Sequence, residues 1–102
     1  MKDKLKTLEE AAALVADGSQ IVMSARLDWA PMAMLRNLVK QGRTGLRLIG
    51  VVGGQINVDY LVGAEATESV DTCSVSLGPY ARTGPNFARH VTQGRIRALD
   101  NT

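Results

Sequence analysis

The sequence predicts an α/β fold in which an open, mostly parallel sheet of about four strands carries helices on both faces. Segments with a helical period alternate with short apolar runs about every 12 residues, which favours right-handed strand–helix–strand units. Hydrophobic residues make up 45% of the 102 residues and aromatic residues only 4%, so the core is expected to be aliphatic. This length suits one core, and we therefore expect residues 1–102 to form a single domain.

The first predicted helix begins at a capping box. Thr7 and Glu10 have the spacing at which a hydroxyl and a carboxylate satisfy the free amides of a helix start. The helical pattern ends at Asp17-Gly18-Ser19. Residues 20–25 follow as a run that is apolar on both faces, and this pattern predicts a strand buried between helices.

Proline and glycine delimit the second helix. Pro31 opens it and Gly42 lies just beyond its end, an asymmetry typical of helices. Residues 46–52 then form a second strand-like run, followed by the pair Gly53-Gly54. The short apolar segment 56–62 is expected to be helical, which gives a strand, a glycine loop and a short helix.

The last third of the chain repeats this alternation. Residues 69–77 are expected to form a third strand, in which Cys73 is interpreted as a small core hydrophobe. Glycines and prolines mark a long turn after it, and residues 85–93 have the pattern of a helix that is followed by Gly94. Residues 95–99 alternate polar and apolar, which is typical of a strand with one solvent-exposed face or of a strand at a sheet edge.

Composition excludes several classes of function. Twelve basic and ten acidic residues are spread along the chain, so no phosphate-binding face and no nucleic-acid partner are expected. No apolar run reaches the ~18 residues of a membrane span, and the first residues do not form a signal sequence. One cysteine fits a reducing compartment, and the expected location is the cytoplasm. One histidine and one cysteine do not supply a metal site.

Candidate binding residues lie in the loops that follow the strands, because ligands of open parallel sheets bind beyond the carboxyl ends of the strands. Gly53-Gly54 would let backbone amides approach a ligand at a helix start, although two glycines there are also typical of a plain turn. Arg26, Asp28 and Trp29 could orient a polar ligand; the alternative is a surface ion pair beside a Trp that covers the core edge.

No nucleophile is evident in these loops. Ser74 and Ser76 have no histidine or acid at a spacing that would activate a hydroxyl, so both are interpreted as ordinary strand residues. His90 lies near the apolar stripe of its helix and is interpreted as a packed residue rather than a catalyst. From the residues alone, the sequence indicates an α/β ligand-binding scaffold without a catalytic group.

Several phrases occur in the order found in family I coenzyme A transferase alpha subunits. They are residues 8–12 (Leu-Glu-Glu-Ala-Ala), 17–19 (Asp-Gly-Ser), 31–33 (Pro-Met-Ala), 53–54 (Gly-Gly), 75–77 (Val-Ser-Leu), 85–89 (Pro-Asn-Phe-Ala-Arg) and 93–96 (Gln-Gly-Arg-Ile). The chain resembles the glutaconate CoA-transferase branch and the related steroid-ring-opening CoA hydrolases most. Family alpha subunits are more than twice as long, so the resemblance implies a Rossmann-like, amino-terminal half, either a fragment or a truncated product.

The resemblance also implies a mechanism and a partner. In the family, the acyl group passes through a glutamate of the beta subunit, which forms a glutamyl-CoA thioester, and the alpha subunit supplies a Gly-Gly-Phe-like loop. The matching positions here are Ser24, Ala25 and Arg26. The implied partners are a beta subunit or a second copy of the chain, together with an acyl-CoA or carboxylic acid. Coenzyme A is then a co-substrate, and no tightly bound cofactor is expected.

We therefore expect a CoA-transferase-like subunit that lines an acyl or acyl-CoA pocket and supplies no catalytic residue. The residues expected to bind substrate or CoA are Ser24, Ala25, Arg26, Trp29, Gly53 and Gly54. Two alternatives remain open: hydrolysis of a CoA ester, and a non-catalytic module that forms homo- or hetero-oligomers through its exposed edge strand or the surface left by the missing half.

Overall fold

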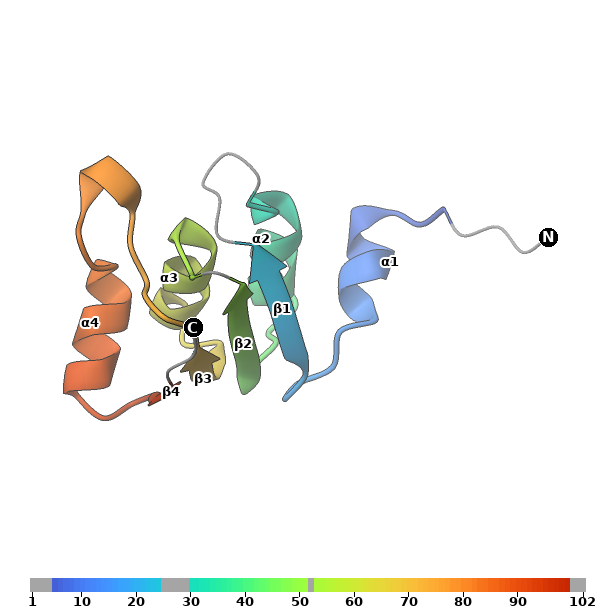
Figure 1. The fold of residues 1–102 in the computed structure, drawn as a ribbon. Helices are drawn as coiled ribbons and strands as arrows, with labels where there is room; N and C mark the ends of the chain where they lie inside the picture. Colours follow the sequence, from blue (N-terminus) through green and yellow to red (C-terminus); the bar gives the residue numbers. More distant parts are fainter. Residues whose placement is uncertain (1–4, 25–29, 52, 100–102) are drawn as a thin grey trace.

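A computed structural model describes residues 5–24, 30–51 and 53–99 of the chain (Figure 1). Helices and strands alternate along it. Their order is α1 (Leu8–Ala13), β1 (Gln20–Ser24), α2 (Met32–Lys40), β2 (Leu46–Val51), α3 (Ile56–Gly63), β3 (Thr67–Asp71), the short 3-10 helix η2 (Gly78–Tyr80), α4 (Pro85–Thr92) and β4 (Arg97–Leu99).

The four strands form one parallel sheet in the order β1-β2-β3-β4. Its register places Leu48 of β2 opposite Ile21 of β1 on one side and Val70 of β3 on the other. The predicted α/β class and the parallel sheet of about four strands are confirmed. β4 lies at an edge, as the alternation of residues 95–99 indicated.

All the helices that connect these strands lie on one face of the sheet. The strand order advances in one direction, and right-handed crossovers then return each helix to the same side. In agreement, α1 contacts α2, α2 contacts α3, and α3 contacts α4, which makes a continuous layer. Figure 1 shows α2 behind β1, with the near side of β1 and β2 uncovered. Within the described part of the chain, the expectation of helices on both faces is therefore wrong.

The core fills the space between the sheet and this helix layer. From the sheet, Leu46, Leu48 and Val70 enter it, and Leu38 of α2 and Leu61 of α3 meet them; all are almost fully buried. Burying a large aliphatic side chain contributes about 1.5–3 kcal/mol, so the covered face is the main source of stability.

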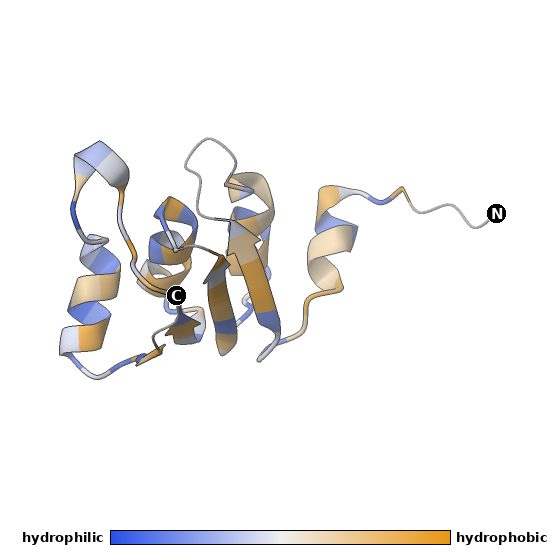
Figure 2. Ribbon diagram, viewed as in Figure 1, coloured by the Kyte–Doolittle hydropathy of each residue, from blue (hydrophilic) through white to orange (hydrophobic). Residues whose placement is uncertain are grey.

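The other face of the sheet is open. Val22 of β1 is 61% exposed and Val51 of β2 is 51% exposed, and Leu99 of β4 is also exposed. Figure 2 shows that β1 and β2 consist largely of hydrophobic residues. Residues 20–24 are thus buried on one face only, which corrects the expectation of a strand buried between helices; residue 25 lies outside the described part.

Local signals set the ends of the helices. Thr7 caps α1: its Oγ1 accepts a hydrogen bond of 3.1 Å from the Glu10 amide, and Glu10 Oε1 accepts one of 3.0 Å from the Thr7 amide. This capping box was predicted, and its hydrogen bonds lower the pKa of the Glu10 carboxyl. Gly42 and Gly94 follow α2 and α4 with φ of 77° and 68°, a region that favours glycine.

The third strand differs from its prediction, since it covers Thr67–Asp71 instead of residues 69–77. The chain bends after Asp71, where Thr72 Oγ1 donates a hydrogen bond of 3.2 Å to the Ser74 carbonyl. Cys73 is exposed in this bend, so its interpretation as a core hydrophobe is wrong. The apolar residue that returns to the core is Val75, which forms an isolated parallel bridge with Gly54.

A buried carboxylate joins α3 to α4. Asp59 of α3 accepts hydrogen bonds from the Phe87 amide (2.8 Å), the Asn86 amide (3.4 Å) and the Asn86 side chain (3.0 Å), at the start of α4. Negative charge at a helix N-terminus is favourable, so Asp59 anchors one helix on the other. His90 of α4 is buried, in agreement with its interpretation as a packed residue. Among the helices described, none has the length and apolarity to cross a bilayer.

Candidate functional site

The candidate site is the edge of the sheet at which β1, β2 and β3 end, together with the segments that follow them; it is called the rim below. Because the strands are parallel, their carboxyl ends meet at one edge. Ser24 ends β1, the pair Gly53-Gly54 follows β2, and residues 72–77 follow β3. Of the predicted binding residues, Ser24, Gly53 and Gly54 are thus brought to one edge. Ala25, Arg26 and Trp29 lie outside the described residues.

Backbone hydrogen bonds hold two of these segments together. The Gly54 amide donates to the Ser74 carbonyl (2.7 Å), and the Ser76 amide donates to the Gly54 carbonyl (3.0 Å). These bonds extend the β2–β3 pairing beyond the regular strands. The polar backbone groups of Gly54 therefore bind within the protein.

Packing explains why glycines stand after β2. A Cβ on Gly54 would lie 2.6 Å from Cγ2 of Val58, inside van der Waals contact. Gly53 has φ of 152°, where a side chain is strained, and a Cβ there would lie 3.3 Å from the Ser74 hydroxyl. Gly54 thus lets α3 start close to the sheet, and Gly53 lets the chain pass close to Ser74; these structural roles accompany any role toward a ligand.

Asn57 joins the first two segments of the rim and was not predicted. Its side chain is 1% exposed, and Nδ2 donates a hydrogen bond of 2.9 Å to the Ser24 carbonyl. Its Oδ1 accepts from the amides of Gln55 (3.1 Å) and Val58 (2.9 Å) in the first turn of α3. One amide side chain therefore fixes the end of β1 against the start of α3. A lone asparagine in an apolar segment was the only signal in the sequence.

An acceptor at the rim lacks a partner. The Oε1 atom of Gln55, the residue before α3, is buried and has no hydrogen-bond partner in the described part of the structure. Leaving a buried acceptor unsatisfied costs about 1–3 kcal/mol, so a donor from a ligand or a second chain would be stabilised there. Gln55 is thus the side chain of the rim whose acceptor lacks a hydrogen-bond donor within the described residues.

The serines of the rim serve the protein itself. Ser76 Oγ accepts a hydrogen bond of 3.1 Å from the Gly78 amide and lies 3.4 Å from the Ala81 carbonyl, which holds the η2 turn. Ser74 supplies the carbonyl that pairs with Gly54. Ser74 and Ser76 lie beyond β3, so their interpretation as strand residues is corrected. Among the described residues, no group of three or more His, Cys, Asp or Glu side chains is placed to hold a metal ion.

Comparisons with known proteins were informative at the level of structure. Neither a protein-family model nor a curated protein matches the chain. Among solved structures, a cysteine-to-serine variant of the decarboxylase AibA/AibB has a TM-score of 0.79 and 25% identity over 95% of this chain. Glutaconate coenzyme A-transferase from Acidaminococcus fermentans has a TM-score of 0.80 and 20% identity over 98% of it.

The chain spans 38% of the AibA/AibB chain and 32% of the glutaconate CoA-transferase chain. Within that span the similarity covers nearly all of the residues, helices and strands alike. The resemblance that the order of sequence phrases indicated is confirmed by the structure. The chain has the fold of the family I coenzyme A transferases, over about a third of the length of these solved chains.

Proposed function

We propose that this chain forms one side of an acyl-CoA site, which a partner chain completes. In this proposal the rim lines the acyl or acyl-CoA pocket, and the residues that bind are Ser24, Ala25, Arg26, Trp29, Gly53 and Gly54. The observation that carries the proposal is the CoA-transferase fold, in which the predicted residues that the structure describes converge on one edge of the sheet.

The partner in this proposal is a beta subunit, which supplies the glutamate nucleophile. Its carboxylate attacks the thioester carbonyl, the CoA thiolate leaves, and the thiolate then attacks the resulting anhydride to give the glutamyl-CoA thioester and the free carboxylate. The task of this chain is to orient the thioester and to stabilise its oxyanion with backbone amides of the rim.

A steric block at the rim tests the proposal. Ser24 and Gln20 lie on the same face at opposite ends of β1, and both are exposed. We expect Ser24→Trp to lower CoA transfer, from an acyl-CoA to a carboxylate, more than tenfold in the presence of a candidate beta subunit. The matched variant Gln20→Trp is expected to keep the rate. The proposal would be contradicted if the wild-type chain together with the beta subunit transferred CoA no faster than the beta subunit alone. Equal rates for the two variants would also contradict it.

The open face of the sheet favours a second candidate function, assembly without catalysis. Exposed Val22, Val51 and Leu99 give this face an apolar character that is typical of an interface. Val22→Lys is then expected to convert an oligomer to a monomer in size-exclusion chromatography with light scattering, while Lys40→Gln on α2, away from the open face, leaves the oligomer intact. A wild-type chain that is monomeric at high concentration would contradict assembly of this chain with itself.

A further inference from the structure

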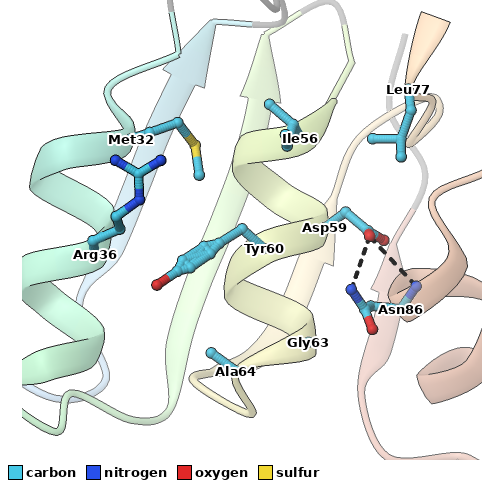
Figure 3. Close-up of a pocket in the computed structure, with 9 residues that line it drawn as sticks. All are labelled: Met32, Arg36, Ile56, Asp59, Tyr60, Gly63, Ala64, Leu77 and Asn86. Atoms are coloured by element: carbon cyan, nitrogen blue, oxygen red, sulfur yellow. Dashed lines mark hydrogen bonds between the residues drawn. The ribbon is translucent and has the colours of Figure 1, made fainter. Parts of the chain in front are cut away.

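A groove on the outer side of the helix layer is separate from the residues proposed to bind acyl-CoA. Its volume is about 570 Å³, within the range of ligand sites. The outward face of α3 forms its floor, α2 forms one wall, and Leu77 and Asn86 form the other (Figure 3). The groove exists because α3 is recessed between its neighbours and carries small residues, Gly63 and Ala64, at the end of that face.

The floor follows from helical spacing. Tyr60, Gly63 and Ala64 follow Ile56 by four, seven and eight residues. This spacing places all four residues on one side of α3. Gly63 is required for the close approach of α4, since a Cβ there would lie 2.6 Å from the side chain of Asn86. The same small residues that allow α4 to pack therefore keep the floor low.

Two polar side chains of the groove, Arg36 and Tyr60, lie at the α2 side. Figure 3 shows Arg36 rising along α2 toward Met32, while Tyr60 reaches from α3 toward α2. Arg36 is exposed, and no hydrogen bond or ion pair joins it to any residue of the described ranges 5–24, 30–51 and 53–99. Both side chains lie on the α2 side of the groove in Figure 3, with the guanidinium turned toward Met32, and a guanidinium without a partner offers two parallel donors to a planar anion.

The one carboxylate of the groove does not oppose an anion. Asp59 is buried, and its oxygens accept the three hydrogen bonds from Asn86 and Phe87, so its charge is compensated by the start of α4. On the opposite wall, Arg89 donates a hydrogen bond to the Asn86 Oδ1 atom (2.9 Å), which adds a second cation near that wall. Across the top of α3, the lining residues Met32, Ile56 and Leu77 are apolar.

We propose that this groove binds a short-chain aliphatic carboxylate, whose head group pairs with Arg36 and Tyr60 and whose chain lies over Ile56 toward Leu77. A carboxylate matches the two parallel donors of one guanidinium, whereas a doubly charged phosphate would call for more cations than this wall holds. One helical turn, about 5.4 Å, separates Tyr60 from Ile56, which suits a chain of roughly five carbons. The proposal does not depend on acyl-CoA binding at the rim.

Hexanoate is the probe that tests this site, with hexan-1-ol and acetate as the ligands that lack the charge or the chain. In titrations followed by ¹⁵N-HSQC spectra at constant ionic strength, we expect hexanoate to shift the amides of Arg36, Tyr60 and Ala64 in a saturable manner. Hexan-1-ol and acetate are each expected to bind about tenfold more weakly. Equal binding of hexanoate and hexan-1-ol would overturn the anion site.

Two variants separate the charge from the apolar contact. Arg36→Gln is expected to weaken hexanoate binding about tenfold, and Ile56→Ser, which removes the apolar floor under the chain and keeps the charge, to weaken it severalfold. Arg97→Gln removes the same charge from exposed β4, outside the groove, and is expected to change nothing. Equal losses of hexanoate affinity in Arg36→Gln and Arg97→Gln would overturn the proposal, as would amide shifts confined to Ser24, Gly53 and Gln55. Either result would leave the proposed acyl-CoA site at the rim unaffected.

Discussion

The two faces of the β-sheet both carry aliphatic residues, but one face is buried and the other is exposed. Leu48 is 1% exposed on the helix-covered face, and Val51, three positions along the same strand, is 51% exposed on the open face. Neighbouring positions of a strand point to opposite faces, so the pleat alone separates them. The comparison teaches that the core of the described fold is built on one face, and that apolar sequence on the other face is available for contacts outside that core.

The largest difference in stability between the two faces is expected when one residue on each face is truncated. Leu48→Ala is expected to lower the free energy of unfolding by about 3–4 kcal/mol, because it leaves a cavity between β2 and the helices. Val51→Ala removes an exposed side chain and is expected to cost about 0.5 kcal/mol or less. Urea denaturation of both variants measures the difference. Similar losses would mean that the open face is covered in the isolated protein.

Asn57→Ala tests the hydrogen bonds that hold the rim together, where both faces of the sheet end. The substitution leaves the Ser24 carbonyl and the amides of Gln55 and Val58 without their partner, and we expect a loss of about 2–3 kcal/mol. Asn37→Ala is the matched control in α2, where the side chain accepts one hydrogen bond from Gln41, and it is expected to cost about 1 kcal/mol. Hydrogen exchange of the Gln55 and Val58 amides should accelerate only in Asn57→Ala.

Gly54→Ala tests whether the close approach of α3 to the sheet is required. The new Cβ meets Val58, and overpacking of this kind costs about 1–3 kcal/mol. The double variant Gly54→Ala with Val58→Ala is expected to be more stable than the sum of the single losses predicts, because the second change removes the clash. Additive losses in urea denaturation would show that Gly54 is not restricted by Val58.

The smallest effect is expected far from both faces, at the start of α1. Thr7→Ala should lower Tm by about 4 °C or less at pH 7, because it removes the hydroxyl half of the capping box. The Glu10 pKa is lowered in the folded protein, so this contribution is present above the ordinary pKa of a glutamate and is lost as the pH falls through the lowered value. Thermal scans at pH 7 and pH 3 should show the difference between variant and wild type narrowing at pH 3.

Sequence reasoning succeeded where the signal is local. The capping box at Thr7, the proline before α2 and the glycines after α2 and α4 act within a few residues, and the helices begin and end there. The alternation of helices and strands likewise predicted the parallel sheet. Each of these features is encoded in neighbouring residues, so it is readable without tertiary structure.

The remaining features depend on contacts between distant segments. The run from Ile21 to Met23 is apolar throughout, and only the strand order decides that one of its faces stays open. β3 begins at Thr67, a polar residue that its neighbours bury, and it ends early because Thr72 bends the chain. At the rim, Asn57 acts through a carbonyl 33 residues away, a contact that spacing does not reveal.

The central claim, that the rim binds an acyl-CoA, is tested most directly by titrating the ¹⁵N-labelled chain with acetyl-CoA at millimolar concentration. We expect the largest shifts at the amides of Gly53, Gln55 and Ser76, and none at Gln20, Leu46 and Thr67 on the opposite edge of the sheet. Absence of shifts at the rim, or shifts of equal size at both edges, would contradict the claim.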